Sequence, residues 1–349
     1  MPISRLLPAS FEQPNPVNYI INSDMEVSQR GTSFTTASGY GDYTLDRWMS
    51  GHTVTGKFSI AQVVDAPTGF KYSLKATSAS AYTVGTNEEF VIRQKIEGTN
   101  CVPLALGTAS AKTVTLSFWV KSSLTGTFSG AFLNSAEDRC YVFTYAISSA
   151  STWEKKEVTV ALDTSGTWLT SSGIGLNLYF SLGAGSGLQA SAGSWISTKD
   201  LTTSSSVNLV GTNAATWQIT GVVLNEGSKA ETFYETYAET FQKCLRYFNR
   251  VTGYNTREFA GYNENTTKGL HVFRFAVKMR GNPTLGLSGT ASNYIIAYSN
   301  TQTACSSAVV FNTTHPEGVT FYSTVASGLT AGQASCLRNI DYIDLKAEL

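Results

Sequence analysis

Short stretches of alternating hydrophobic and polar residues follow one another along residues 18–227, and Gly, Ser, Thr and Asn separate them. In the segment TVTLSFWVK every second residue from Val114 to Val120 is hydrophobic, which is the period of a β-strand with one buried face. Similar patterns predict strands at residues 18–22, 57–63, 90–96, 113–121, 139–147, 153–162, 174–182 and 216–224.

These strands indicate the architecture of the first part of the chain. No stretch between them has a helical pattern long enough for a βαβ crossover, so we expect antiparallel pairing. The connections differ in length, which favours a jelly-roll β-sandwich over an up-and-down barrel. The longest weakly patterned connection, residues 183–206, is rich in Gly and Ser and is expected to be functional or mobile.

The spacing of hydrophobic residues changes after the last of these strands. Tyr237, Phe241, Cys244 and Phe248 recur at intervals of three or four residues, which predicts one amphipathic α-helix over residues 232–249. Two interpretations remain open. The helix packs on its own sandwich, or helices from several copies meet at a symmetry axis through these four residues.

The β pattern resumes after this helix. Strands are predicted at residues 271–278, 293–299, 308–312, 319–324 and 340–345, enough for a second, smaller sandwich. The predicted fold class is therefore all-β: a jelly-roll β-sandwich, a short connecting α-helix and a smaller C-terminal β-sandwich. The expected domains are an N-terminal docking arm (1–17), a jelly-roll domain (18–227), a linker helix (228–252) and a C-terminal sandwich (253–349).

The N-terminal arm contains four prolines, which fix φ, remove a hydrogen-bond donor and favour extended backbone. Its hydrophobic residues Leu6, Leu7 and Phe11 would be more stable against a neighbouring protein than in water. We therefore expect the arm to dock through them. A disordered terminus is the alternative, because terminal segments are often disordered unless they are docked.

Composition narrows the classes of function. Only 14% of the 349 residues are charged, and 25 basic side chains balance 25 acidic ones. Because nucleic acids and anionic membranes bind clustered Lys and Arg, we expect neither as a partner. No apolar run approaches the ~20 residues that span a bilayer, and the N-terminus lacks the apolar segment of a secretory signal. We expect a soluble protein folded in a reducing cytosol.

Candidate catalytic and metal-binding groups are sparse. The three histidines are far apart and the five cysteines have no C-x-x-C spacing, so we expect no zinc site and mostly buried free thiols. No nucleophile elbow, P-loop or dinucleotide motif occurs. Asp42/Asp46 and Glu88/Glu89 are nominal carboxylate pairs for glycoside hydrolysis, which we interpret as solvated turn residues. A structural Ca²⁺ bound by oxygen atoms of residues 22–26 is an alternative that remains open. Apart from it, we expect no cofactor.

Aromatic residues are the strongest candidates for ligand contacts. All six tryptophans lie within residues 48–217, and most are expected to pack in the core. Trp195 differs, because it lies in an Ala-Gly-Ser-Trp segment of the long Gly- and Ser-rich connection, where a sugar ring could stack on it. Tyr262, Tyr294 and Tyr298 are the candidate glycan contacts in the C-terminal sandwich.

Several longer strings add a resemblance. They are NYIIN (18–22), VSQRG (27–31), YTLDRW (43–48), SFWVKS (117–122), TWEKK (152–156) and ITGVVLNEG (219–227). As a set they resemble a module of tailed-phage virion proteins, chiefly tail fibres, and residues 275–284 resemble a strand and turn of fibre C-terminal domains. Ser23 and Met25 depart from the family, which more often has Gly and Phe there, and the arm is shorter than a long fibre shaft.

The resemblance implies a carbohydrate-binding-module-like jelly roll in a homotrimeric adhesin. We therefore expect a phage virion protein, assembled in the bacterial host cytoplasm, that docks on tail or capsid proteins and binds host surface polysaccharide without catalysis. Tyr237, Phe241, Cys244 and Phe248 would then meet at the threefold axis. A capsid fibre or decoration protein with a structural, particle-stabilising role is the alternative, and a depolymerase is a third.

Overall fold

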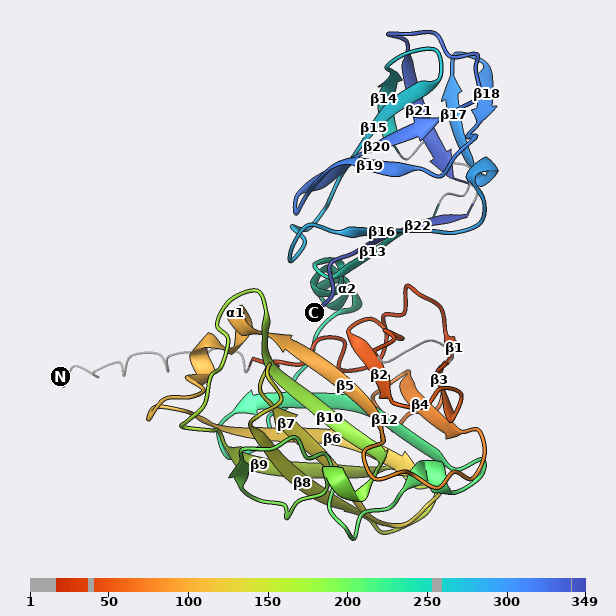
Figure 1. Ribbon diagram of the computed structural model, residues 1–349. Coiled ribbons are helices and arrows are strands. Elements are labelled where there is room, and N and C mark those ends of the chain that lie inside the picture. Colours follow the sequence, from red (N-terminus) through yellow and green to blue (C-terminus); the bar gives the residue numbers. More distant parts are fainter. Residues whose placement is uncertain (1–16, 37–40, 253–258, 340) are drawn as a thin grey trace, which may run out of the picture.

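The computed structural model describes residues 17–36, 41–252, 259–339 and 341–349. Figure 1 shows two β units, with helix α2 (Tyr237–Leu245) and the C-terminal end of the chain between them. This architecture confirms the predicted all-β fold class. The other helical segments described are single turns: α1 (Gly98–Cys101), η1 (Val102–Leu104), η2 (Ser186–Leu188), η3 (Leu209–Gly211) and η4 (Ala291–Asn293).

Two six-stranded sheets form the first unit, a jelly-roll β-sandwich in which neighbouring strands pair antiparallel. One sheet has the order β1 (Ser33–Thr35), β3 (Phe58–Val63), β4 (Ser73–Ser78), β12 (Thr216–Glu226), β6 (Thr113–Ser122) and β9 (Glu154–Ala161). The other has the order β11 (Trp195–Ile196), β8 (Cys140–Ile147), β7 (Gly126–Leu133), β10 (Ile174–Ala184), β5 (Glu89–Glu97) and β2 (Trp48–His52).

The main hydrophobic core lies between these two sheets. Trp48, Phe180 and Trp217 are fully buried in it. Phe118 packs edge-on against Phe180, with 5.1 Å between the ring centroids, and the indole N–H of Trp217 donates to the hydroxyl of Tyr145 at 3.0 Å. Because burying one phenylalanine side chain stabilises a fold by ~1.5–3 kcal/mol, this aromatic cluster is a large part of what holds the sheets together.

The first and last segments of this unit lie side by side. The side chain of Asn18 accepts the backbone N–H of Leu224 at 3.0 Å and donates to the carbonyl of Val222 at 3.1 Å. The backbone N–H of Tyr19 also donates to Leu224 O at 3.0 Å. The sandwich is therefore closed by a contact between its two ends.

Residues 18–22 form bends instead of the predicted strand, so this prediction is wrong. Asn22 has φ +58, and its side-chain amide donates to the carbonyls of Val27 at 2.8 Å and Asp46 at 2.9 Å. Such side-chain bonds to the backbone compete with strand pairing. The amide oxygen of Asn22 accepts the N–H of Val27 at 2.9 Å. This oxygen, one of the candidate Ca²⁺ ligands in residues 22–26, therefore already has a hydrogen-bond partner.

The Gly- and Ser-rich connection after β10 is packed on the outer face of the second sheet. Its residues Leu188 and Ile196 contact a small hydrophobic cluster on that face. The ammonium of Lys199 lies 2.8 Å from the carboxylate of Glu89 and 2.9 Å from that of Glu137. This part of the sheet is therefore covered by the chain itself.

Helix α2 is shorter than the predicted residues 232–249. It begins after Thr236, whose side chain and that of Glu239 form a capping box. Phe248 is outside the helix and begins strand β13 (Phe248–Thr252), which pairs with β22 (Tyr342–Lys346). The linker predicted at residues 228–252 therefore contains a strand of the C-terminal unit.

The second unit is a sandwich of a three-stranded and a seven-stranded sheet. The smaller sheet has the order β13, β22, β16 (Thr284–Leu287). The larger has the order β18 (Thr301–Ala304), β17 (Tyr294–Tyr298), β21 (Ala334–Asn339), β14 (Phe259–Asn263), β15 (Lys268–Arg274), β20 (Gly318–Thr324) and β19 (Val310–His315). A separate hydrophobic core fills it, with Phe259, Ile296, Phe321 and Leu345 buried.

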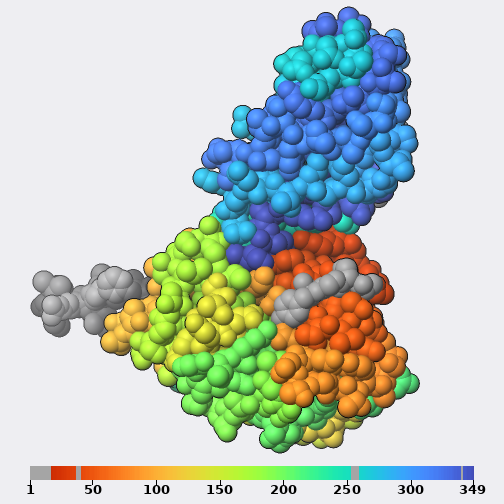
Figure 2. Space-filling view, viewed as in Figure 1, coloured from red at the N-terminus to blue at the C-terminus, as the bar shows by residue number. Residues whose placement is uncertain are grey.

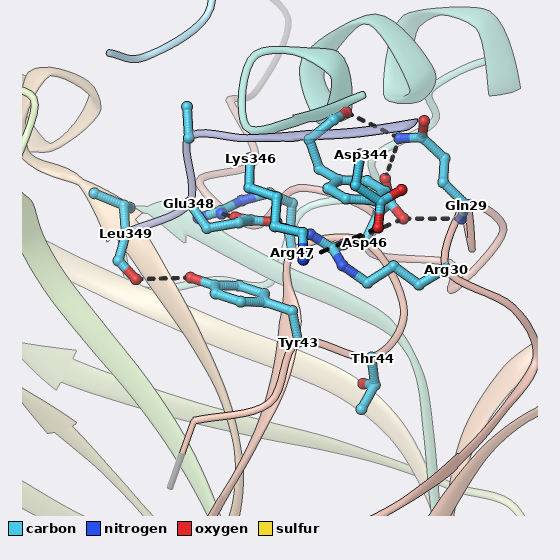
Figure 3. A network of polar contacts seen from close by, with 12 residues as sticks. Gln29, Arg30, Tyr43, Thr44, Asp46, Arg47, Asp344, Lys346, Glu348 and Leu349 are labelled. Atoms are coloured by element: carbon cyan, nitrogen blue, oxygen red, sulfur yellow. Dashed lines mark hydrogen bonds and ion pairs between the residues drawn. The ribbon is translucent and has the colours of Figure 1, made fainter. Parts of the chain in front are cut away.

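The two units meet at a buried ionic cluster, which Figure 3 shows. The carboxylate of Glu348 lies 2.9 Å from the guanidinium of Arg30 and also pairs with that of Arg47. Arg30 stacks on the ring of Phe248, 3.5 Å from its centroid, and Arg47 on that of Tyr247 at 3.7 Å. The cluster therefore joins side chains from the first unit, the segment after α2 and the C-terminal end.

The backbone of the last residues is held as well. Lys95 Nζ donates to Leu349 O at 2.6 Å, and the hydroxyl of Tyr43 donates to the same oxygen at 2.9 Å. Arg280 Nε donates to Ala347 O at 2.7 Å. Figure 2 shows the C-terminal residues, in dark blue, wedged between the two units. We call residues 347–349 the C-terminal latch.

Candidate functional site

An aromatic cluster lies at the edge of the first unit, where the predicted Trp195 is partly exposed. Trp195 and Trp168 meet edge to face, with 5.4 Å between ring centroids and an interplanar angle of 89°. Tyr141 lies against Trp195 at 5.5 Å, because the strand pairing of β11 with β8 sets these two residues opposite each other. We call Tyr141, Trp168 and Trp195 the aromatic platform; Trp168 is only 9% exposed, so the partly exposed Tyr141 and Trp195 provide the surface open to a ligand.

Hydrogen bonds fix the orientation of both indoles. Trp195 Nε1 donates to Ala161 O at 2.8 Å, and Trp168 Nε1 donates to Ser165 O at 2.9 Å. Each buried or half-buried indole N–H thus has a partner within the chain. The rings are held before any ligand binds, which reduces the ordering that binding requires.

An ion pair holds the loop that carries Trp168. Arg139 donates from Nε and Nη2 to the two carboxylate oxygens of Asp163, at 2.6 and 3.0 Å, and Ser165 donates from its N–H and its hydroxyl to Asp163, both at 3.0 Å. Burial of Asp163 would raise its pKa, but the hydrogen bonds from Arg139 and Ser165 outweigh that effect and hold the pKa below its usual value. Asp163 is therefore a charged anchor for the loop.

A small cavity of about 280 Å³ opens beside Trp168. It is close to the lower end of the ~300–1,000 Å³ range of small-molecule pockets. Leu169, which lines this cavity, is 38% exposed. Its lining is mainly apolar with two hydroxyl groups: Cys101, Val102, Ala105, Leu106, Thr108, Trp168, Leu169 and Thr170.

The lining offers apolar surface and hydroxyl groups. Among the described residues that line the cavity there is no carboxylate and no histidine, so an acid and base pair for glycoside hydrolysis is not at hand. The thiol of Cys101 is buried, and burial together with the charge of Glu97 raises its pKa to about 12, so it is protonated at neutral pH. An apolar ring face with hydroxyl groups at its edge matches the two sides of a sugar ring.

The nominal carboxylate pairs are structural. Asp46 and Glu89 are buried, which corrects their interpretation as solvated turn residues. Asp46 accepts the backbone N–H of Gln29 at 3.0 Å, and Glu89 pairs with Lys199 at 2.8 Å. No cluster of three or more His, Cys, Asp or Glu side chains that could hold a metal ion occurs within residues 17–36, 41–252, 259–339 and 341–349.

The tyrosines predicted as glycan contacts separate into two groups. Tyr262 is 46% exposed on the outer face of the seven-stranded sheet. Tyr294 and Tyr298 are buried, which corrects their assignment as stacking surfaces. Their hydroxyls bond to carbonyl oxygens, that of Tyr294 to Ser288 O at 2.9 Å and that of Tyr298 to Gly328 O.

The residues predicted for oligomerisation do not form one exposed stripe. Cys244 and Phe248 are buried within their own chain, which corrects their place in a contact between copies. Tyr237 is exposed and Phe241 partly so, and their rings stack with 5.8 Å between centroids. The predicted docking residues Leu6, Leu7 and Phe11 lie outside the described residues.

The main residue that the sequence analysis missed is Trp168. It follows Ser165 and Gly166 in a polar loop, a context similar to that of Trp195. The five cysteines, in contrast, are buried free thiols as predicted. Within the part of the chain that the structure describes, no helix has the length and hydrophobicity of a bilayer-spanning segment.

Comparison with protein-family models and with curated proteins gives no match. Solved structures with a similar arrangement include the enzymatically active domain of tailspike protein 4 of bacteriophage CBA120, at 15% identity and a TM-score of 0.32 over 55% of this chain and 21% of that one. This chain thus spans about a fifth of the tailspike domain.

For two further structures the similarity extends over their whole length. A sugar-binding protein from Bacteroides thetaiotaomicron is 12% identical, with a TM-score of 0.37 over 60% of this chain and 100% of that one. A family 11 carbohydrate-binding module from Clostridium thermocellum is 14% identical, with a TM-score of 0.28 over 56% of this chain and 100% of that one. At these low TM-scores the jelly-roll assignment rests on the strand order described above.

Proposed function

We propose that the chain is a phage virion adhesin that binds host surface glycans through the first unit without catalysing their cleavage. The observation that carries the proposal is the rigid aromatic platform beside a small apolar cavity. The sequence resemblance to tail-fibre modules supports the virion location and the homotrimer, and the hydrophobic residues of the proline-rich arm support docking through residues 1–17. Repeated copies would compensate for the weak affinity of each shallow site.

The proposal predicts that Leu169→Glu weakens glycan binding. Leu169 is 38% exposed, so the substitution places a charge in the cavity with little effect on folding, on the order of 0.5 kcal/mol. We expect affinity for a host surface glycan to fall at least tenfold, about 1.4 kcal/mol. The measurement is a host glycan array followed by titration of the glycans that bind.

Val64→Glu is the matched control, because Val64 is a 79% exposed hydrophobic residue of the same unit outside the aromatic platform. It should bind like the wild type. A wild-type protein that binds no host surface glycan contradicts the proposed function. Equal affinities of the Leu169→Glu and Val64→Glu variants would show that the glycan does not bind at this cavity.

The second candidate is a capsid fibre or decoration protein with a structural role. The observation that favours it is the buried ionic cluster at the C-terminal latch, which joins the two units into one body suited to a fixed place on a particle. The same array decides between the candidates, since a decoration protein needs no affinity for glycans.

A further inference from the structure

Four residues form a row across the outer face of the seven-stranded sheet in the C-terminal unit. Tyr262 on β14 pairs with Leu270 on β15, Leu270 with Tyr322 on β20, and Tyr322 with Val310 on β19. Direct cross-strand partners project from the same face of a sheet. Tyr262 and Val310 are exposed and the other two are partly exposed. We call these four residues the tyrosine row.

The strand pairing sets the spacing of the tyrosine row. Tyr262 and Tyr322 are separated by one intervening strand, so their backbones lie two strand spacings apart, about 9.5 Å. The residues next to the row, such as His271 and Phe321, point to the opposite face and are buried in the core. Two aromatic side chains are thus presented at a fixed separation comparable with the length of a disaccharide.

Positive charges lie at both ends of the intervening strand. Lys268, Leu270, Val272 and Arg274 alternate along β15 and therefore share the outer face. Lys268 Nζ lies 3.9 Å from the ring centroid of Tyr322. Among the described residues Arg274 has no carboxylate within 4.0 Å, whereas Lys268 lies 3.7 Å from Glu264, a partly exposed pair whose attraction water weakens. The face thus offers two cations beside its aromatic rings and one carboxylate, that of Glu264, which also accepts from the hydroxyl of Tyr322 at 3.5 Å.

Polar groups interrupt this face, which disfavours a protein partner. Thr320 and Thr324 flank Tyr322 on β20, and Asn312 Nδ2 donates to Thr320 Oγ1 at 3.2 Å. The centre of a protein interface is usually depleted of Lys, Asp and Glu, whereas Lys268 lies beside Tyr322 here. Aromatic rings interleaved with hydroxyl groups and cations instead match a ligand that has apolar ring faces, hydroxyl edges and negative charges.

We propose that the tyrosine row binds an extended acidic polysaccharide. Its sugar rings stack on Tyr262 and Tyr322, and its carboxylates pair with Lys268 and Arg274. The tyrosine row shares no residue with the aromatic platform of the first unit. Either site can therefore exist without the other.

The test is titration of the full chain with polygalacturonate, with its neutral methyl ester and with polysialic acid. We expect at least one of the acidic chains to bind, and the methyl ester to bind at least tenfold more weakly than polygalacturonate if that is the ligand. Tyr262→Ala should weaken binding at least tenfold. Arg274→Gln should reduce the dependence of affinity on salt, because it removes a screened charge contact.

Tyr234→Ala is the matched control, since Tyr234 is an 84% exposed tyrosine outside the row. Leu169→Glu should leave this binding unchanged, which separates the tyrosine row from the site of the proposed function. Failure of the wild-type chain to bind either acidic polysaccharide overturns the proposal. So does a lower sedimentation mass of the Tyr262→Ala variant, because the tyrosine row would then be a contact between copies.

Discussion

His271 is a buried histidine in the core of the C-terminal unit. Its ring nitrogens lie 3.2 Å from the hydroxyl of Ser335 and 3.4 Å from that of Ser323, both neutral partners. Burial lowers its pKa to about 4. The folded state therefore holds this ring uncharged at pH values where the unfolded chain, with a pKa of about 6.5, begins to protonate it.

This difference predicts an acid-sensitive C-terminal unit. Between pH 6.5 and 4 the unfolded state binds more protons, so the free energy of unfolding falls by about 1.4 kcal/mol per pH unit through His271. Relative to His271→Asn, the wild type should lose about 2 kcal/mol between pH 7 and pH 5. Urea unfolding of both proteins at both pH values measures this loss of stability. His315→Asn, at an exposed histidine, should keep the wild-type pH slope, and the same slope in His271→Asn would contradict the assignment.

At the residue scale the sequence indicates which side chains share a face but not which face is covered. Tyr294, Ile296 and Tyr298 alternate along β17 and all point into the core, so the tyrosines are unavailable to a ligand. Trp195 was identified from its Gly- and Ser-rich context. Trp168 lines the cavity only because Arg139 and Asp163 hold its loop, a contact across 24 residues that no local pattern shows.

Helix α2 shows how local signals compete. Two Thr-x-x-Glu strings, starting at Thr232 and at Thr236, could each cap a helix. The string that starts at Thr236 caps the helix. Glu235 of the first string instead accepts from the hydroxyl of Thr240 at 2.9 Å and pairs with Lys243. The alternation that predicts strands is less ambiguous, and most of the predicted strands coincide with observed ones.

The exposed side chains of α2 predict its role in assembly. If helices meet at a threefold axis, Tyr237 and Phe241 are the residues of the predicted stripe still available for the contact. Phe241→Asp should then convert a trimer into monomers while the first unit stays folded, because Phe241 is not part of its core. Sedimentation gives the mass, and Gln242→Asp, at an exposed neighbour, is the control. A monomeric wild type, or an unchanged mass, would contradict this role.

At the scale of the whole molecule the C-terminal latch sets the position of the second unit. Glu348 is separated by 301 residues from Arg47 and by 318 from Arg30, so no local pattern could predict the cluster. Burial would lower the pKa of Arg47, but the charge of Glu348 raises it well above its usual value. Arg47 therefore stays charged inside the protein and depends on this carboxylate.

Glu348→Gln should loosen the contact between the two units. It leaves the guanidinium of Arg47, 1% exposed, without its carboxylate partner, and breaking a buried pair in this way costs about 3–5 kcal/mol. Other contacts between the units remain, among them Arg246 with Glu97 at 2.6 Å and Lys95 with Leu349 O at 2.6 Å. We expect a larger radius of gyration by small-angle scattering and a first unfolding step at lower denaturant concentration.

Glu157→Gln is the control. It removes an exposed partner of Lys155 and should change stability by less than ~1 kcal/mol. Unchanged scattering would show that the latch does not hold the units together.

The contact between Asn18 and the end of β12 has a mechanical consequence. If the chain is the virion adhesin that we propose, anchored before residue 18 and loaded beyond residue 227, the tension on an attached particle passes through the first unit. Because Asn18 bonds to Leu224 and Val222, the two points where the force enters and leaves are adjacent. Apart from the share that the C-terminal latch carries, the load therefore falls on these few bonds before it stretches either sheet.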